Sequence, residues 1–233
     1  MKHSFSQRWG LGLALMFCAS SVFVSAQSKR LNDAARHSGA AAQVFNQIMG
    51  VKERGIPRDL LDRAEAIAVF PGVVKAAFII GGHGGQGIIS RRIKGGWSAP
   101  AFFNLGGGSF GAQIGAQKTD YVLLIMNDEG LNGLLKDKFE MGGEVSVSAG
   151  PVGRTAAATT NAMLDAAILS YSRSRGAFIG AALKGGTITP DNDLNEAVYG
   201  TKAKDVLNPG KAASEAPAEV RIFPATLSRY SRK

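Results

Sequence analysis

Residues 67–117 read IAVFPGVVKAAFIIGGHGGQGIISRRIKGGWSAPAFFNLGGGSFGAQIGAQ, and this stretch decides the fold. Short apolar runs, such as Ala76–Ile80 and Ala101–Phe103, lie between clusters of glycine, and no helical period is present. Glycine pairs are typical of tight turns between strands. We therefore predict an antiparallel, glycine-rich sheet whose short strands follow one another as a meander.

The segments on either side of this stretch have helical and buried-strand patterns. Leu31–Met49 carries apolar residues at helical spacing and predicts an amphipathic helix, and Arg58–Ala66 predicts a second, short helix. Because the apolar face of the first helix is mostly alanine, its composition favours packing on the sheet over insertion into a membrane. Tyr121–Met126 is continuously apolar, which predicts a central strand buried on both faces.

The second half of the chain alternates short strands with short helices. Asn127 is placed to cap a helix with an acidic first turn, and Asp193 with Glu196 resembles the capping box of a later helix. Further strands are predicted at Glu144–Ala149, Ile168–Tyr171 and Ala177–Leu183. The expected fold class is therefore α+β: a mainly antiparallel, glycine-rich twisted sheet with an N-terminal amphipathic helix and a few short helices.

The first residues have the three parts of a secretory signal. Lys2 and Arg8 are basic, Leu11–Val24 is apolar, and Val24-Ser25-Ala26 is a small-residue cleavage site. The apolar run is shorter than the roughly 20 residues of a membrane span. We expect a periplasmic or secreted product, with peripheral membrane association. The predicted divisions are a signal peptide at 1–26, one domain at 27–202 and a weakly ordered tail, rich in Pro, Ala and charge, at 203–233.

Cys18 is the only cysteine, and it lies inside the predicted signal. The bulky Phe17 before it disfavours lipidation, because lipoprotein signals have a small residue there. Cleavage near Ala26 would leave a product without cysteine. Its stability would then come from core burial, which a chain of this length can supply without disulfides.

The charge balance favours an anionic partner. The chain has 27 Lys and Arg against 18 Asp and Glu, a net charge of +9. Phospholipid headgroups, acidic polymers and nucleic acid all attract such a protein. Export argues against nucleic acid. A basic surface that only maintains solubility is an equally good explanation of the charge alone.

Glycine-rich motifs resemble two known sites without their required contexts. Gly82, Gly84 and Gly87 fit GxGxxG, as do Gly106, Gly108 and Gly111, but strand-like residues follow each motif where a dinucleotide site needs a helix. Residues 107–111 fit the GxSxG nucleophile motif around Ser109. All three histidines precede Ser109, which excludes the hydrolase order, so a cryptic hydrolase would need His83 and a carboxylate that the sequence does not identify.

Metal and cofactor sites are not predicted. Only His37 and His83 remain after residue 26, which is too few ligands for a zinc cage. Residues 191–196 resemble the start of a calcium loop, but the sixth position is Glu196 where the loop needs glycine. Helix capping is the favoured interpretation of these acids, and we predict a protein without metal, cofactor or enzymatic activity.

Basic residues beside apolar segments form the candidate binding site. Alternation places Arg91 and Arg92 on opposite faces of a strand that ends at a Gly-Gly turn. About 1 kcal/mol of attraction per basic residue would recruit such a surface to an anionic membrane. The candidate headgroup-binding residues are Arg91, Arg92, Lys94, Arg173, Arg175, Lys29, Arg30 and Arg36. The alternative is that these charges are scattered and solvated.

Several long motifs resemble the SYLF lipid-binding family. Besides the opening stretch, they are TDYVLLIMNDEGLNGLL at 119–135, GPVGR at 150–154 and YSRSRGAFIGAALKGGTITPD at 171–191. The resemblance covers roughly residues 31–200 and implies a lipid-binding protein that performs no catalysis.

The resemblance also implies partners. Eukaryotic SYLF proteins bind phosphoinositides, and some fungal relatives bind actin filaments. For an exported protein, actin and phosphoinositides are implausible partners, whereas the anionic phospholipids of a bacterial envelope are plausible ones. The alternative is a structural or interaction module that binds an envelope protein through its sheet edges.

Overall fold

The computed structural model describes residues 7–51, 55–143, 145–153, 165–174, 177–181 and 185–231. Within it, the side chains of residues 7–26, 76–81 and 108–116 are outside the description. The helices are α1 Gln7–Met49, α2 Arg58–Arg63, α3 Asp128–Leu134, α5 Asn192–Tyr199, α6 Ala203–Leu207 and α7 Ile222–Tyr230, with the 3-10 helices η2 Ala213–Glu215 and η3 Ala218–Val220. The strands are β1 Ala66–Ile93, β2 Gly96–Trp97, β3 Ala101–Ile125, β4 Phe139–Glu140, β5 Val147–Ala149, β6 Ile168–Ser174, β7 Ala177–Gly180 and β8 Thr187–Pro190. The α+β fold class is confirmed.

Two very long strands, β1 and β3, form the centre of the fold. They pair antiparallel from Ala66 opposite Ile125 to Ile89 opposite Ala101, with one register shift between Phe70 and Val73 and another between Ala77 and Ile79. The prediction of a meander of short strands is therefore wrong. The Gly95-Gly96 pair lies at a turn between β1 and β2 as predicted, whereas the other glycine clusters of this stretch lie inside the strands, where they permit bends and close backbone approaches.

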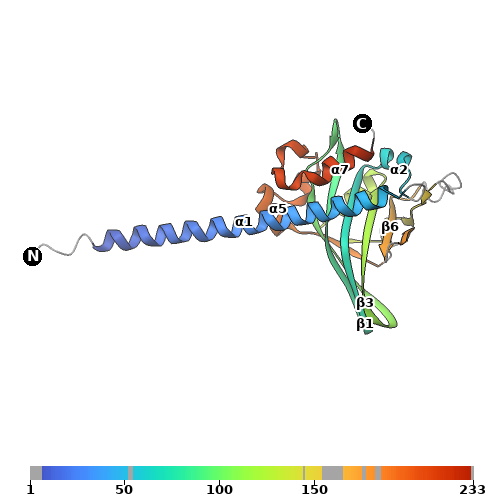
Figure 1. Cartoon of the computed structure of the whole chain (residues 1–233), viewed down its shortest axis with the longest axis horizontal. Coiled ribbons are helices and arrows are strands. Elements are labelled where there is room, and N and C mark those ends of the chain that lie inside the picture. Colours follow the sequence, from blue (N-terminus) through green and yellow to red (C-terminus); the bar gives the residue numbers. More distant parts are fainter. Residues whose placement is uncertain are drawn as a thin grey trace, which may run out of the picture.

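Strand β1 doubles back on itself. The backbone N–H of Arg92, near the C-terminal end of β1, donates at 2.7 Å to the carbonyl of Glu65, which directly precedes the start of the same strand. A Cβ atom added at Gly87 would lie 2.4 Å from the carbonyl oxygen of Val69. The two halves of β1 thus lie side by side, and the bend falls near the second register shift. Figure 1 shows β1 and β3 turning at an end of the molecule remote from α5 and α7.

The shorter strands extend this folded ribbon at its helical end. Strand β6 pairs with β3 from Ile125 opposite Ile168 to Asp120 opposite Arg173, and it also pairs with β5 and β7. Strand β8 pairs with residues 103–106 of β3 and with β4. Residues 122–125 lie between β1 and β6 and are fully buried, which confirms the predicted central strand.

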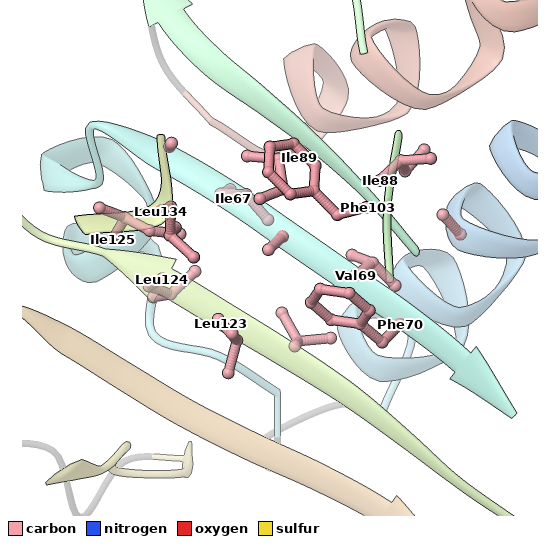
Figure 2. Close-up of a cluster of buried hydrophobic side chains, with 14 of the residues drawn as sticks. Ile67, Val69, Phe70, Ile88, Ile89, Phe103, Leu123, Leu124, Ile125 and Leu134 are labelled. Atoms are coloured by element: carbon pink, nitrogen blue, oxygen red, sulfur yellow. The ribbon is translucent and has the colours of Figure 1, made fainter. Parts of the chain in front are cut away.

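The core is formed by side chains from both long strands and from α3 (Figure 2). Each fully buried Leu, Ile, Val or Phe side chain contributes roughly 1.5–3 kcal/mol through removal from water. The residues labelled in Figure 2 are Ile67, Val69, Phe70, Ile88, Ile89, Phe103, Leu123, Leu124, Ile125 and Leu134.

Helix α1 packs one face against this core. Ala34, Ala41, Phe45 and Ile48 are buried, and the ring of Phe45 meets that of Tyr230 at 5.9 Å. This confirms the predicted amphipathic helix and its interpretation as a packing element. The backbone helix continues without a break from Gln7, through the predicted signal segment. None of the helices in the described part of the chain combines the length and the hydropathy that a transmembrane segment requires.

The segment after residue 202 is folded, so the prediction of a weakly ordered tail is wrong. Val220, Phe223 and Leu227 are buried on one face of η3 and α7, and the hydroxyl of Ser38 in α1 donates to the carbonyl of Val220 at 2.7 Å. The residues rich in Pro, Ala and charge conceal an apolar spacing of three and four residues, which is the pattern of a packed helix.

Helix capping agrees with one prediction and corrects another. The side chain of Asn127 accepts a hydrogen bond from the backbone N–H of Gly130 at 2.9 Å, as expected. Helix α5 is capped by Asp191, which accepts from the N–H of Leu194 at 3.1 Å, and not by Asp193. The predicted role of this acidic segment in helix capping is thus confirmed, but the capping residue lies two positions before the predicted one.

Candidate functional site

The basic residues at the end of β1 have structural partners. Arg91 donates to the carbonyl of Leu207 at 3.4 Å and to the side chain of Asn208 at 3.1 Å, and its guanidinium lies 3.9 Å from the carboxylate of Asp128. These contacts connect the end of β1 to α6 and to the start of α3. Arg91 is therefore only partly available to an external ligand.

Arg92 is held more firmly. Its side chain donates to the carbonyl of Ala64 at 2.9 Å and to that of Leu61 at 2.5 Å, at the end of α2. Its guanidinium also lies over the ring of Trp97, 4.3 Å from the centroid. Burial is the main cause that lowers the pKa of Arg92, and the carboxylates of Asp62 and Glu65 oppose it. The geometry is that of a structural clamp.

Lys94 is the exposed member of this group. It directly precedes Gly95, which has a left-handed φ of 91° in the turn between β1 and β2. We call Arg91, Arg92 and Lys94 the basal turn. Lys94 is the cation of the basal turn that extends into solvent.

The predicted residues on β6 do not extend the basal turn. The guanidinium of Arg173 lies 3.2 Å from the carboxylate of Asp120, and Asp120 also accepts from the backbone N–H of Gly72 at 2.8 Å. This pair joins β6 to β3 and to the bulge in β1. Arg175 lies outside the described residues.

The predicted residues on α1, which are Lys29, Arg30 and Arg36, lie in a third region of the molecule. Lys29 and Arg30 are exposed near the point where the side chain of Gln27 contacts the carbonyl of Ala197 in α5. Arg36 lies one to two turns further on and pairs with Asp33 at 3.1 Å. The structure therefore distributes the seven predicted residues that it describes over three regions, and it does not bring those seven together in one patch.

Sequence reasoning missed two lysines on the long ribbon. Lys75 and Lys118 are exposed on neighbouring strands, where Val74 is opposite Lys118 and Lys75 is opposite Gln117. Side chains of paired residues share a face and successive residues alternate, so one lysine lies on each face of the ribbon. We call them the rim lysines, because they border the bend of the ribbon.

Charge along most of the ribbon is of one sign, and Asp120, near the end of β3, is the one acid in the two long strands. Residues 66–119 contain five cations and no aspartate or glutamate. The five are Lys75, Arg91, Arg92, Lys94 and Lys118. The lack of acidic residues could have been recognised from the sequence alone, because it requires only a count of Asp and Glu along the segment predicted to form strands.

His83 lies half-buried on this ribbon. Its ring lies against Gly107 on β3 and Gly186 near β8, and its buried Nε2 has no hydrogen-bond partner. Burial, and after it the charge of Lys75, lowers the pKa of His83. Within the described residues, no carboxylate contributes to this shift. The arrangement lacks the third member of a hydrolase triad, and the side chain of Ser109 lies outside the description.

Neither the glycine motifs nor the described acidic residues form a nucleotide or metal site in the described part of the chain. Both GxGxxG matches lie within β1 and β3, and neither precedes a helix. Among the described side chains, no group of three or more His, Cys, Asp or Glu could hold a metal ion. The fold thus defines a class of protein: an α+β domain built on a long, glycine-rich and mostly basic ribbon.

Comparison with known proteins identifies the family. The family model described as "Ysc84: Las17-binding protein actin regulator" matches residues 106–230, more than half of the chain. The chain belongs to this Ysc84, or SYLF, family, and the resemblance seen in the sequence is confirmed. The match includes the C-terminal helices that composition did not predict.

Named relatives come from fungi and vertebrates. The chain is 36% identical over 159 residues to "LAS seventeen-binding protein 3" of Saccharomyces cerevisiae, covering 66% of this chain and 34% of that protein. It is 34% identical over 179 residues to "SH3 domain-containing protein PJ696.02" of Schizosaccharomyces pombe, covering 74% and 41%. It is 30% identical over 176 residues to "SH3 domain-containing YSC84-like protein 1" of Mus musculus, covering 72% and 52%. The chain thus spans about a third to a half of these relatives. Their names are those of binding or regulatory proteins, not of enzymes.

Proposed function

We propose that this domain is a non-enzymatic module that binds anionic phospholipid surfaces. The observation that supports this proposal most is the absence of acidic residues from residues 66–119, which carry five cations. A protein with scattered, purely solubilising charge would have both signs along so long a segment. The net charge of +9 acts in the same direction.

Electrostatic attraction is the expected source of the affinity. A basic residue near an anionic leaflet contributes about 1 kcal/mol, and this attraction decays within a Debye length of about 8 Å at physiological salt. Lys94, Lys75, Lys118, Lys29 and Arg30 are exposed cations that could supply it. Arg92 and Arg173 would act indirectly, by fixing the strands that carry the others.

The compartment is part of the proposal. A basic n-region, an apolar run and a small-residue site before Gln27 support export, with the domain acting in the periplasm or outside the cell. Fractionation of cells that produce the whole chain, with mass measurement of its N-terminus, tests this. A product that begins near Gln27 in the exported fraction is expected, and an uncleaved product in the cytosolic fraction would contradict export.

Co-sedimentation with vesicles tests the lipid proposal. Vesicles of phosphatidylcholine alone are compared with vesicles that contain increasing phosphatidylglycerol, each over a series of salt concentrations. We expect pelleting to rise with the anionic lipid and to fall with salt, because charged groups supply the attraction. Equal pelleting with neutral vesicles, or none with either, would contradict the proposal.

A protein partner is the second candidate. Within the described residues, β7 pairs with β6 alone, and Ile179 on β7 is 56% exposed. A short edge strand with an exposed apolar residue can accept a strand from another protein. The names of the yeast relatives, which refer to binding Las17, also favour a protein partner of some kind. A cross-linked protein that survives lipid extraction and is lost in Ile179→Lys would support this candidate.

A further inference from the structure

The bend of the long ribbon is the part of the sheet with the fewest neighbours. Strand β6 pairs with β3 only at residues 120–125, and β8 pairs with it only at residues 103–106. Among the described residues, the segment of β3 between these two sites pairs with β1 alone. Figure 1 shows this bend projecting away from the helices.

The same bend has an unusual composition. We define the ribbon tip as residues 76–81 of β1 with residues 108–116 of β3. The tip contains no charged residue, and apart from Ser109 and Gln113 it is made of apolar residues and glycine. Its large apolar residues are Phe78, Ile79, Ile80, Phe110 and Ile114. Beside it lie Val74, which is 40% exposed, and the rim lysines.

We propose that the ribbon tip enters the interfacial layer of an anionic membrane, with Lys75 and Lys118 at the level of the headgroups. This inference rests on the proposed function and identifies the element that performs it. The order of residues along the ribbon matches the order of layers in a membrane. The uncharged apolar tip would face the acyl chains, and the lysine that follows it on each face would meet the anionic headgroups. A second copy of the chain is a weaker candidate for the partner of the tip, because a contact between two apolar tips would not require the rim lysines at its border.

The open edges of the tip limit its depth. Backbone groups on an unpaired strand edge have no water to bond with in hydrocarbon, and each unsatisfied group there costs several kcal/mol. The tip therefore stays in the hydrated boundary between headgroups and acyl chains. This depth suits a peripheral protein that binds reversibly and whose affinity depends on salt.

The basal turn belongs to the opposite end of the ribbon. Arg92 is bonded through its backbone to Glu65, at the base where β1 begins, whereas the rim lysines lie between the two register shifts, next to the bend. Both ends cannot lie in one membrane plane. The inference thus selects the rim lysines over Lys94 as the main headgroup contacts.

Environment-sensitive fluorescence tests where the membrane meets the protein. Ile80→Cys is made in the whole chain that also carries Cys18→Ser, and the new thiol is labelled with a nitrobenzoxadiazole dye. Ser214→Cys, on an exposed position of η2, is the matched control. With phosphatidylglycerol vesicles we expect emission from the Ile80 site to shift to shorter wavelength and to be quenched by lipid-linked nitroxide, while the Ser214 site changes in neither respect.

The outcomes separate this inference from the proposed function. If the protein pellets with anionic vesicles but the dye at residue 80 responds no more than the dye at residue 214, the ribbon tip is not the contact and the lipid-binding proposal stands. If neither labelled protein pellets with vesicles, both fail. A concentration-dependent shift at residue 80 without vesicles, with a doubled mass in light scattering, would assign the tip to a second copy and overturn the inference.

A substitution supplies an independent check that does not depend on the dye. Ile80→Asp should reduce vesicle pelleting at least tenfold, because a carboxylate would replace an apolar side chain beside the anionic headgroups, while circular dichroism confirms that the variant is folded. Ser214→Asp has the same change of charge and should pellet as the parent does. Equal pelleting of the two folded variants would contradict insertion of the tip.

Discussion

The guanidinium of Arg92 lies 4.3 Å from the centre of the Trp97 ring, and the same side chain donates hydrogen bonds to the carbonyls of Ala64 and Leu61. These contacts tie the end of α2 to the β1–β2 turn. A planar guanidinium can stack on a ring and donate in its own plane at the same time, which a lysine cannot do. The sequence places Arg92 among the candidate headgroup ligands, whereas its contacts are those of a structural residue.

Arg92→Lys should therefore lower the free energy of unfolding by about 2 kcal/mol, since charge-assisted hydrogen bonds and the ring contact are lost together. Denaturant unfolding measures this. Lys94→Gln, two residues away and exposed, is the control and should change stability by less than about 0.5 kcal/mol. If Arg92→Lys kept its stability but lost vesicle binding, Arg92 would be a ligand of the headgroups after all.

Gly87 tests the doubling back of β1. A Cβ atom there would lie 2.4 Å from the carbonyl oxygen of Val69 and 2.4 Å from the Phe70 ring, so backbone must move. We expect Gly87→Ala to destabilise the domain by roughly 2 kcal/mol. Gly39→Ala is the matched change in α1, where nothing lies within 4 Å, and it should stabilise by about 1 kcal/mol through helix propensity. Thermal unfolding that ranks the two variants in the other order would refute the close approach.

The histidines give stability a defined pH dependence. Burial is the main cause that lowers the pKa of both His37 and His83, assisted by Arg36 and Lys75 respectively. The folded state thus favours the neutral form of both imidazoles. Their contribution to the free energy of unfolding is present above the ordinary pKa of 6.5 and is lost as the pH falls below that value. The free energy of unfolding should fall between about pH 7 and pH 5, and less so in His37→Gln/His83→Gln. An identical slope in that variant would show that carboxylates alone cause the loss.

The C-terminal helix should contribute strongly to stability. Phe223 is fully buried, whereas its neighbour Ile222 is 49% exposed. Removing the Phe223 ring should cost about 3–5 kcal/mol in Phe223→Ala, while Ile222→Ala should cost less than about 1 kcal/mol. Urea titrations of the two variants make the comparison. Two equally small effects would mean that α7 is not part of the cooperative core.

The sequence predicts local elements better than long-range ones. Leu31–Met49, Tyr121–Met126 and the Asn127 cap could be predicted because periodicity and capping are local signals. The glycine clusters before and after Gly95-Gly96 could not be assigned from sequence, because a glycine that permits a close approach, such as Gly87 against Val69, looks the same as one that makes a turn. Average composition likewise concealed the spacing of Val220, Phe223 and Leu227, which pack on α1.

The candidate site shows the same division. Sequence identifies cations but not their partners, so Arg92 with its carbonyls and Arg173 with Asp120 could not be distinguished from the exposed Lys94. Lys75 and Lys118 are 43 positions apart in the chain, and only the strand register places them at the same bend. The absence of acids around them was available from the sequence alone.

The most direct test of the account is the effect of the rim lysines on binding to anionic vesicles. Lys75→Gln/Lys118→Gln is compared with Lys202→Gln/Lys204→Gln, which removes the same charge from exposed positions at α6. At about 1 kcal/mol per lysine, the rim variant should bind phosphatidylglycerol vesicles about 30-fold more weakly than the parent chain. The α6 variant should differ from the parent by less than about threefold, because α6 contacts Arg91 at the basal turn, away from the bend, where salt screens the attraction. Equal losses in the two variants would show that net charge alone attracts the protein, and unchanged binding in both would contradict electrostatic attachment through the ribbon.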